Sequence, residues 1–423
     1  MRTQRYKRYP AYKDSGVQWI GEIPVGWTLK HLKRIVEFRG GGTPSKDNLD
    51  FWSGDVPWVS PKDMKKPTVE ETEDRITLEA IRQSATNLVP AESVLMVVRS
   101  GILAHSIPVA ITSREVTINQ DLKALLPTSD VAAKYLMYFV SGMQVELLDR
   151  WKKEGATVES LELDLVANTP TPLPPMGEQR TIASFLDRET ARIDELVAKK
   201  ERLIELLQER RTALITHAVT KGLDSTVAMK DSGVEWIGEI PAHWEVKALR
   251  HAVLFQRGYD LPSDAREEGT VPVVSSSGVS SIHSQAIATA PGIVTGRYGT
   301  IGTFHLLSED YWPLNTTLYS IDLNGNEPRF LRYMLTHLSP LFTLNSMKSA
   351  VPGVDRNDIH PLATAVPPID EQYEIADFLD HETARIDALA AKVREAIDRL
   401  KEYRTALISA AVIGKIDVRE EVK

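Results

Sequence analysis

A seven-residue spacing of apolar side chains marks two long stretches of the chain. In the later stretch the spacing places apolar residues at Leu379, Ile386, Val393, Leu400 and Leu407, with Leu389, Ala396, Tyr403 and Ala410 at the alternate position. In the earlier stretch it comprises Leu186, Ile193, Leu207 and Leu214, with Lys200 as one polar interruption. A heptad spacing is typical of helices that pack along a shared seam. These residues are therefore the predicted seam of a helix pair.

Each heptad stretch is predicted to form a single helix of about 40 residues, which is about 60 Å at 1.5 Å per residue. A Pro-Pro pair begins at Pro174 and another at Pro367, and Gly222 and Gly414 stand where the two helices would end. Apolar seams of this length require a partner helix. A homo-oligomeric coiled coil would supply one, but two matching seams in one chain favour antiparallel pairing within the molecule.

The region before each helix alternates short β-branched runs with Gly, Pro and Asn turns, which indicates a mixed α/β domain with exposed loops. The two regions correspond loosely. "FRGGGTPS" at Phe38 corresponds to "QRGYDLPS" at Gln256, and "VVRSG" at Val97 to "TGRYG" at Thr295. The turn residues recur while the residues between them change. Two copies of one enzyme would instead be expected to keep the same reactive side chains.

Two stretches repeat more closely and show that the chain is a tandem duplication. "KDSGVQWIGEIP" at residues 13–24 returns at 230–241 with one substitution, and the block that starts at Leu173 returns without a gap at Val366.

The predicted fold class is α/β (α+β), with two α/β domains separated by two long helices that form an antiparallel coiled coil. The predicted regions are domain 1 at 1–176, helix 1 at 177–222, domain 2 at 223–366 and helix 2 at 367–423.

Composition narrows the class of protein without identifying it. The 423 residues are 42% hydrophobic and 26% charged, with a net charge of −8 and no cysteine. This is typical of a globular protein, and without cysteine no disulfide or thiolate metal site can form. No apolar run approaches the roughly 20 residues that span a bilayer, and the basic N-terminus lacks the apolar region of a signal peptide. We therefore expect a cytoplasmic protein.

No catalytic or metal motif is recognised in the sequence. The Pro-Pro pairs lie in "LPPM" and "VPPI", not in the Asn-Pro-Pro-aromatic or Asp-Pro-Pro-aromatic motif of amino-methyltransferases, and no phosphate-binding loop occurs. "GRYGTIG" at Gly296 lacks the following helix and the acidic partner of a dinucleotide site. The histidines have no ligand spacing. We expect no catalytic residue, no metal and no cofactor bound by this chain.

The order of these features resembles the specificity subunit of type I restriction-modification systems. The features are a variable domain, "PLPPMGEQ" or "AVPPIDEQ" opening a long helix, "ARID" and "RTALI" within it, and then the whole arrangement again. The resemblance implies two target-recognition domains that each read one half of a bipartite, asymmetric site in double-stranded DNA. It also implies two methyltransferase (modification) subunits that use S-adenosylmethionine, and two restriction subunits that use ATP with Mg.

Candidate DNA contacts follow from side-chain chemistry, because the arginine fork matches guanine O6 and N7 and lysine suits phosphate. Arginines beside glycine can approach DNA closely, since glycine leaves space for the backbone. The candidates are Arg39, Lys62, Lys65, Lys66, Arg99, Arg257, Ser275, Ser276, Arg297 and Tyr298. The basic, tyrosine-rich stretch from Arg2 to Lys13 is predicted to be a disordered terminus or a phosphate contact.

Two other classes of function remain open from the sequence. One is an enzyme whose two domains carry hydrolase or nuclease chemistry without a recognisable motif. The other is a coiled-coil scaffold without a role on DNA.

Overall fold

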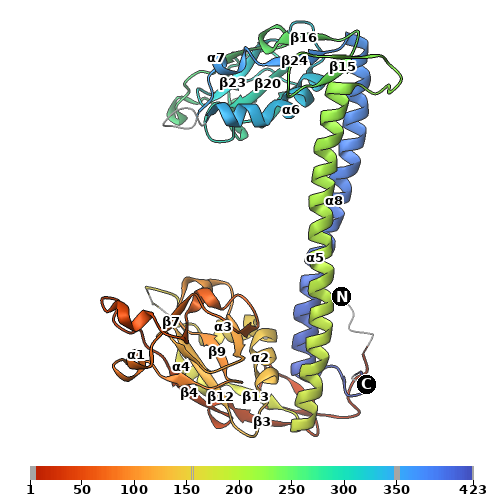
Figure 1. The fold of residues 1–423 in the computed structure, drawn as a ribbon. Coiled ribbons are helices and arrows are strands. Elements are labelled where there is room, and N and C mark those ends of the chain that lie inside the picture. Colours follow the sequence, from red (N-terminus) through yellow and green to blue (C-terminus); the bar gives the residue numbers. More distant parts are fainter. Residues whose placement is uncertain (1–5, 154, 156, 347–352, 422–423) are drawn as a thin grey trace. The chain divides into compact units, whose positions relative to one another are not determined.

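The computed structural model describes residues 6–153, 155, 157–346 and 353–421. The chain divides into two compact units, of which the first is Met1–Lys199 with Ala396–Lys423 and the second is Lys200–Glu395 (Figure 1). Each unit contains one variable region and parts of both long helices. The ranges predicted from the sequence follow the order of regions along the chain, whereas each compact unit takes in parts of two helices.

The first variable region consists of short strands and short helices. Its strands are β1 (Tyr12–Asp14), β2 (Glu22–Pro24), β3 (Thr28–His31), β4 (Val36–Gly40), β5 (Val56–Val59), β6 (Thr68–Val69), β7 (Asp74–Ile76), β8 (Leu88–Val89), β9 (Val94–Val97), β10 (Val109–Thr112), β11 (Val116–Ile118), β12 (Leu122–Pro127) and β13 (Pro170–Leu173). Its α-helices are α1 (Leu78–Arg82), α2 (Ala133–Gly142), α3 (Gln144–Trp151) and α4 (Leu163–Ala167). Its 3₁₀ helices are η1 (Leu32–Arg34), η2 (Leu49–Trp52), η3 (Pro61–Asp63) and η4 (Gly101–Ala104).

The second variable region repeats this arrangement with fewer elements. Its strands are β14 (Met229–Asp231), β15 (Glu239–Pro241), β16 (Glu245–Ala248), β17 (Leu254–Arg257), β18 (Val271–Ser275), β19 (Gly278–His283), β20 (Gly292–Gly296), β21 (Phe304–Leu307), β22 (Trp312–Pro313), β23 (Thr317–Asp322) and β24 (Ala363–Val366). Its helices are α6 (Pro328–Ser346), α7 (Arg356–Ile359), η5 (Leu249–His251) and η6 (Ser263–Ala265).

The sheets of the two units share one topology. The first unit has the order β4-β12-β9-β10-β6, and the second has β17-β23-β20-β21, with antiparallel neighbours at all equivalent positions. Each unit also has a parallel pair, β5 with β11 and β18 with β22. The hairpin β1-β2 corresponds to β14-β15, and the pair β3-β13 to β16-β24. The duplication that the sequence predicts is therefore present in the fold.

The central strands form because their side chains are apolar on both faces. β9 and β20 are buried along their whole length, as expected for strands covered on both sides. Helix α2 packs against β9 and β10, and α6 packs against β20 and β21. Each unit therefore has its own core, to which the adjoining helix segments contribute.

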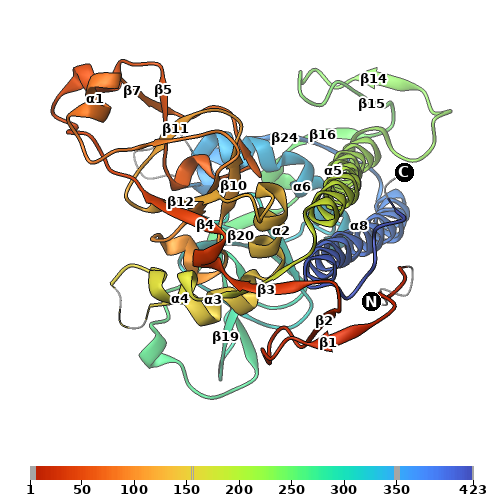
Figure 2. The ribbon, with the colours of Figure 1, turned by 90° about the horizontal axis from the view of Figure 1, so that it is seen from below.

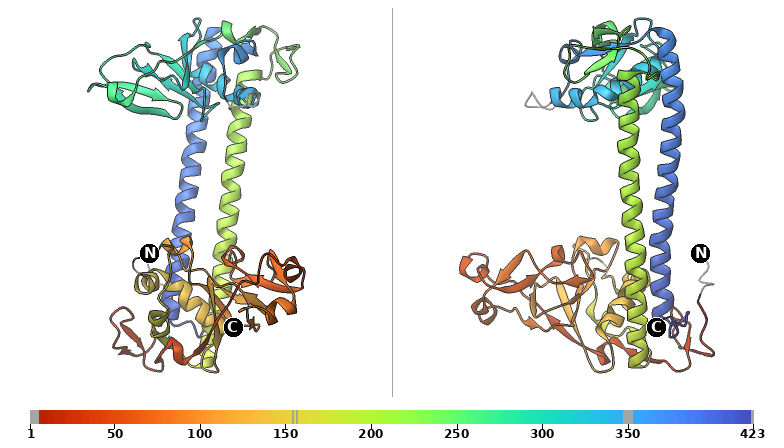
Figure 3. Two further views of the ribbon diagram at one scale, coloured as in Figure 1. Left: turned by 90° about the vertical axis from the view of Figure 1, so that its left-hand side faces the viewer. Right: turned by 45° about the vertical axis from the view of Figure 1, so that its right-hand side comes forward.

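The two heptad stretches are single helices, α5 (Met176–Lys221) and α8 (Ile369–Val412). Each begins directly after a Pro-Pro pair, because proline is tolerated before the first turn and cannot continue a helix interior. Gly222 directly follows α5 and Gly414 lies two residues after α8, with positive φ angles of 74° and 75° that glycine adopts without strain. Within each unit, segments of α5 and α8 lie side by side (Figure 3).

The seam residues lie between these helix segments. In the second unit Leu207 packs with Ile386 and Ala390, whereas the later residue Ile215 belongs to the same cluster as Leu379, so the two segments run antiparallel. The buried seam residues are Leu186, Ile193, Leu207, Leu379, Ile386, Val393 and Leu407, and the partly buried ones are Leu214 and Leu400.

At Leu389 and Ala396 the buried position lies one residue later than the heptad count predicts, whereas Ala410 is buried as predicted and Tyr403 packs partly buried against the core. Leu389 is 46% exposed, so its prediction is wrong, while Ala390 and Ile397 are buried. The same later position holds Arg211 in the first helix and Arg404 in the second. Because these arginines are polar, a count of apolar residues alone does not reveal this position of the seam.

Candidate functional site

The strongest cluster of predicted DNA contacts lies at one edge of the second sheet. Arg257 ends β17 and Arg297 directly follows β20, and both line one open cavity of about 620 Å³. Arg356, at the start of α7, and the aromatic Tyr259 line the same cavity. Arg257 pairs with Leu318 of β23, the strand that lies between β17 and β20. The structure thus brings together two arginines that the sequence places 40 residues apart and adds a third.

Arg297 is held by its backbone while its side chain is available for a ligand. Its amide donates to the carbonyl of Thr316 at 2.8 Å, and its own carbonyl accepts from the amide of Val354 at 2.9 Å. The guanidinium lies 4.8 Å from the ring centre of Tyr298. Such a cation–π contact restricts the arginine and leaves its fork free to donate. Tyr298 itself is partly exposed.

At Gly258 two loops pack so closely that a residue with a side chain would not fit. A Cβ at this position would overlap the backbone carbonyls of Pro313 and Leu314. The amide of the next residue, Tyr259, donates to the carbonyl of Pro313 at 2.8 Å. This close approach of two loops fixes the position of Arg257 relative to the cavity.

Of the two predicted serines, Ser275 is the last residue of β18 and Ser276 lies in the turn between β18 and β19. The Ser275 hydroxyl donates to the carbonyl of Gly278 at 3.0 Å and lies 3.1 Å from the hydroxyl of Ser277. Ser276 lies close to Gly296 and Gly299. The hydroxyl of Ser275 therefore has a local structural role, and Ser276 is the one nearer to the loop of Arg297.

The equivalent edge of the first unit is more strongly engaged in internal contacts. Arg39 donates to the carbonyl of Leu88 at 2.9 Å and pairs with Glu37 at 2.8 Å. The Nε of Arg99 lies 3.3 Å from a carboxylate oxygen of Asp121, but its side chain is mostly exposed. Arg39 lies near the end of β4, the counterpart of β17, and Arg99 follows β9, the counterpart of β20. Of the two side chains, that of Arg99 is the more exposed.

The three predicted lysines of the first unit differ in their surroundings. Lys62 pairs with Glu73 and Asp74, each at 2.9 Å, and the hydrogen bond to Glu73 together with that to Asp74 raises the pKa of its ammonium group. Lys65 and Lys66 are exposed. A lysine already paired with two carboxylates is less available to a phosphate, so Lys65 and Lys66 are the better candidates.

Sequence reasoning missed Arg356, because it lies about 60 residues beyond Arg297 and has no glycine beside it. Its neighbour Asp355 caps α7, with a side-chain oxygen that accepts from the amide of Asn357 at 2.9 Å. The sequence "VDRND" carries the capping signal, so it could have located the turn, but only the fold shows that the turn reaches the cavity.

The motif "EQ" at the start of each long helix anchors the helix to its variable region. The side chain of Gln179 accepts from the amide of Ala132 at 2.8 Å and donates to the carbonyls of Asp130 and Pro174. Gln372 does the same in the second unit, accepting from the amide of Glu327 at 2.9 Å. Both glutamines are buried, so each hydrogen bond satisfies a group that water cannot reach.

The glutamate of the same motif binds a tryptophan that follows the repeated stretch "WIGEIP" in each unit. Trp27 lies three residues after the first copy and donates its indole N–H to Glu178 at 3.0 Å. Trp244, at the equivalent position, donates to Glu371 at 2.9 Å. Both tryptophans are buried, and each also lies against the glycine that follows the other helix. The repeated stretch therefore docks a hairpin where the two helices meet.

A tyrosine and a carboxylate join each variable region to its long helix at a second point. In the first unit the Tyr138 hydroxyl donates to Asp187 at 2.7 Å, and Lys134 pairs with the same carboxylate at 2.5 Å. Burial raises the pKa of Tyr138, so its hydroxyl stays protonated. The first helix is thus fixed to α2 by a network of three polar groups.

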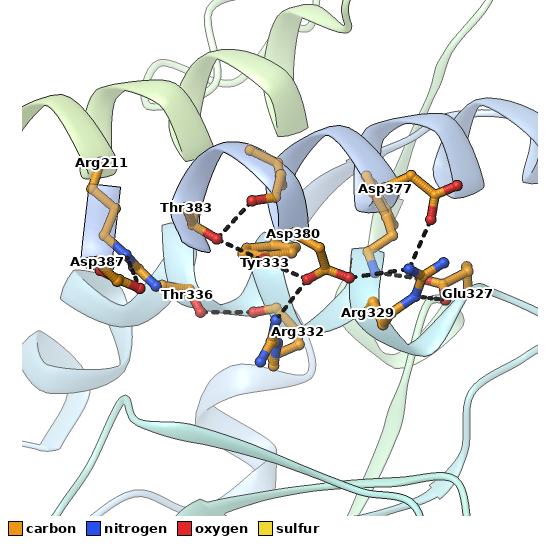
Figure 4. Close-up of polar contacts among 12 residues, drawn as sticks. Arg211, Glu327, Arg329, Arg332, Tyr333, Thr336, Asp377, Asp380, Thr383 and Asp387 are labelled. Atoms are coloured by element: carbon orange, nitrogen blue, oxygen red, sulfur yellow. Dashed lines mark hydrogen bonds and ion pairs between the residues drawn. The ribbon is translucent and has the colours of Figure 1, made fainter. Parts of the chain in front are cut away.

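The second unit has a larger network at the equivalent position (Figure 4). Asp380 accepts from the Tyr333 hydroxyl at 2.7 Å, from Arg329 at 3.0 Å and from Arg332 at 3.2 Å. Arg329 also pairs with Glu327 at 2.9 Å and with Asp377. The hydrogen bonds that Arg329 donates to Glu327 and Asp377 raise the pKa of its guanidinium further above its usual range.

The helix segments carry one reciprocal ion pair in each unit. Arg404 pairs with Asp194 at 2.9 Å in the first unit, and Arg211 pairs with Asp387 at 3.1 Å in the second (Figure 4). Both aspartates belong to the motif "ARID" and both arginines to "RTALI". Each repeat therefore supplies the acid in one unit and the base in the other, as two-fold pseudosymmetry requires.

In the described part of the chain, no group of three or more histidine, cysteine, aspartate or glutamate side chains could hold a metal ion. No helix among the same residues is both long enough and apolar enough to cross a membrane.

The duplicated α/β sheets, joined to paired helices by repeated anchors, define a class of protein with two related variable domains and one shared helical framework. The family described as type I restriction modification DNA specificity domain matches residues 24–206 and 241–399, and the chain belongs to this family. The two matched ranges correspond to the two copies of the duplication.

Curated relatives support the same family. The chain is 37% identical over 209 residues to the type I restriction enzyme EcoR124I/EcoR124II specificity subunit of Escherichia coli, covering 49% of the chain and 51% of the relative. It is 28% identical to the MjaIX specificity subunit of Methanocaldococcus jannaschii over 57% of the chain and 55% of the relative. These matches span about half the length of those two relatives. A putative MjaX specificity subunit from the same organism is 22% identical, with 95% and 96% covered.

Solved structures share the fold. A chain solved in work on complex assembly of the type I R-M system has a TM-score of 0.75 at 14% identity, covering 93% of this chain and 99% of that one. The HsdS subunit from Thermoanaerobacter tengcongensis has a TM-score of 0.54 at 15% identity, covering 93% and 98%.

Proposed function

We propose that this chain is the DNA-binding specificity subunit of a type I restriction-modification complex, and that each variable region reads one half of a bipartite, asymmetric site in double-stranded DNA. The observation that carries the proposal is that the two units share one strand order while the side chains at their sheet edges differ. β4-β12-β9-β10 and β17-β23-β20-β21 have the same order, while their loops present different side chains. One scaffold with two different reading surfaces fits a target whose halves have different sequences.

The arginine cluster of the second unit supplies the chemistry for reading bases. Arginine donates two parallel hydrogen bonds to guanine O6 and N7, and a good bidentate pair discriminates by about 1 to 3 kcal/mol. Arg297, restrained by Tyr298, is the candidate for this contact. Arg257 and Arg356 line the same cavity and can contact either a base or the adjacent phosphate. In the first unit Arg99 takes the place of Arg297, and Lys65 and Lys66 are the candidates for phosphate.

The proposal assigns catalysis to partner subunits. We infer that two methyltransferase subunits use S-adenosylmethionine and that two restriction subunits use ATP with Mg, while this chain binds no cofactor. The pseudosymmetry supports two identical partners, because each repeat contributes equivalently to the anchors and to the ion pairs. The chain would act in the cytoplasm, where such a complex meets DNA.

Sequencing of methylated bases in a host tests the proposal. The host would carry this gene with its neighbouring methyltransferase, and a matched host would carry the methyltransferase alone. We expect a two-part motif with unread base pairs between its halves, present only when this chain is expressed. A motif that persists without this chain, or an uninterrupted palindrome, would contradict the proposal.

A further inference from the structure

The beginning of α5 is covered by an N-terminal arm, residues 6–13. The ring of Tyr6 meets that of Phe185 edge to face at 5.3 Å, and Phe185 is fully buried. The Tyr9 hydroxyl donates to Glu178 at 2.6 Å. Burial, together with this hydrogen bond, raises the pKa of Tyr9, so its hydroxyl stays a donor. The prediction of a disordered terminus is wrong for the arm, and Arg2 and Arg5 of the same stretch lie outside the described residues.

The arm is held in place by the chain that follows α8 (Figure 2). Lys7 forms a β-bridge with Asp417, and its ammonium group pairs with Glu420 at 2.9 Å. The guanidinium of Arg419 lies 5.0 Å from the ring centre of Tyr9. In the first unit, an arm rich in tyrosine and basic residues therefore covers an aromatic and acidic helix face.

On the equivalent face of α8 in the second unit, no described aromatic ring packs against Phe378 as Tyr6 packs against Phe185. The duplication aligns Phe185 with Phe378 and Glu178 with Glu371. Phe378 is 37% exposed, although its counterpart is buried. The repeated stretch, followed back toward the N-terminus, aligns Tyr6 with Leu223, and Leu223 is exposed as well. The second unit thus keeps the counterparts of Phe185 and Glu178, but the stretch aligned with the arm contains no tyrosine.

A cavity of about 380 Å³ lies at this surface. Its lining includes Leu223, Val227, Pro241, His243, Glu371 and Glu374. The carboxylate of Glu371 accepts from Trp244, as Glu178 accepts from Trp27 in the first unit. Its other oxygen lies 2.5 Å from Nε2 of His243, where Glu178 instead accepts from Tyr9. Glu374 and Phe378 lie on the same helix face as Glu371, at spacings of three and four residues. We call Glu371, Glu374, Phe378 and this cavity the α8 socket.

We propose that the α8 socket binds a peptide segment of a partner protein, one that carries a tyrosine flanked by lysine or arginine. The chain's own arm provides the chemical template, because it covers the aligned residues of α5 with this composition. The tyrosine ring would cover Phe378 and its hydroxyl would donate to Glu371 in place of His243, while the basic residues would face Glu374 and Asp224, another carboxylate that lines the cavity. The proposal does not depend on the DNA-reading role.

Binding of a labelled peptide to the full chain tests the socket. The probe has the sequence of Tyr6–Lys13, YKRYPAYK, with a fluorophore at its C-terminus. We expect saturable binding of one peptide per chain by fluorescence anisotropy, because the chain's own arm covers the first site. Affinity should fall as salt rises, since the contact joins opposite charges. Phe378→Ala and Glu374→Lys should each weaken binding about tenfold, which corresponds to about 1.4 kcal/mol.

Two matched variants and a second peptide sharpen the test. Glu402→Lys makes the same charge reversal on an exposed part of α8, and Leu206→Ala removes an exposed apolar side chain on α5. Both should bind the peptide as the parent does. A peptide with phenylalanine in place of the tyrosine aligned with Tyr9 should bind more weakly, because it lacks the hydroxyl.

Three results would overturn the proposal. The first is the absence of saturable binding, and the second is binding that Phe378→Ala and Glu374→Lys leave unchanged. The third is self-association of the chain in sedimentation experiments that Phe378→Ala abolishes, because the occupant would then be the arm of a second copy. Circular dichroism of each variant shows that a loss of binding is not a loss of folding.

Discussion

The two variable regions keep the same anchors and differ at the sheet edges that we propose read DNA. Gln179 and Gln372 make equivalent hydrogen bonds to the chain before their helices, and Trp27 and Trp244 donate to equivalent glutamates. At the sheet edges the similarity ends. Arg39 is held by Glu37 and a backbone carbonyl, whereas its counterpart Arg257 lines an open cavity.

This difference shows where each kind of constraint acts. A buried polar anchor cannot change without leaving a desolvated group unpaired, which costs about 1 to 3 kcal/mol. An exposed loop residue can change at little cost in stability. The duplicated scaffold can therefore stay constant while the loops adopt new side chains, which is what a protein that reads two different sequences requires.

The anchor side of the comparison predicts the largest effect, at Trp244. Trp244→Ala should lower the free energy of unfolding by about 3 to 5 kcal/mol, because it removes a buried aromatic ring and the donor to Glu371. Trp236→Ala, within the repeated stretch that precedes Trp244, should have little effect since Trp236 is 48% exposed. Chemical denaturation followed by circular dichroism measures both. Equal losses would show that Trp244 is not a specific anchor.

The helix seam gives the next largest effect and a control at the adjacent residue. Leu207→Lys should destabilise the second unit by about 2 to 4 kcal/mol, because it places a charge beside Ile386 and Ala390. Leu206→Lys should be nearly neutral, since Leu206 is exposed. Thermal unfolding of the two variants separates them, and similar melting temperatures would contradict the described seam.

The unequal carboxylate networks predict a smaller difference between the units. Asp380→Asn should cost about 1 to 3 kcal/mol, because it weakens hydrogen bonds to Tyr333, Arg329 and Arg332. Asp187→Asn should cost less, since Asp187 has one ion pair and one tyrosine. Hydrogen exchange of α6 and α2 locates each loss. Equal destabilisation would mean that the additional arginines contribute little.

The smallest effect concerns the reciprocal ion pairs. A double-mutant cycle with Arg404→Ala and Asp194→Ala should give a coupling energy of about 0.2 to 1 kcal/mol, because the pair is substantially exposed. The equivalent cycle at Arg211 and Asp387 should give a similar value. A coupling energy above this range in only one unit would contradict the proposed equivalence.

Local sequence patterns predicted much of the framework. Heptads located both helices, and Pro-Pro pairs and glycines gave their ends, because these signals act within a few residues. The choice of Leu389 over Ala390 failed because Arg211 and Arg404 occupy that seam position and interrupt its apolar pattern. The duplication itself was visible from the two repeated stretches.

The proposed DNA-reading site could be predicted only in part. Arg257 and Arg297 were predicted from the glycines beside them, whereas the sequence does not show that the start of α7 brings Arg356 to the same cavity. Lys62 was chosen by charge alone, and only the fold reveals its two acidic partners. The stretch that contains the arm was predicted to be a disordered terminus or a phosphate contact, because the chain after α8 that holds it lies about 400 residues away in the sequence.

The central claim, that each variable region reads its own half of the target, is tested most directly at Arg297. The measurement is sequencing of methylated bases in a host that expresses the Arg297→Ala chain with its methyltransferase, in parallel with the unchanged chain. The account predicts that one base position in one half of the motif becomes degenerate, with a discrimination loss of about 1 to 3 kcal/mol, while the other half stays intact. A motif that is unchanged, or that loses positions in both halves, would contradict it.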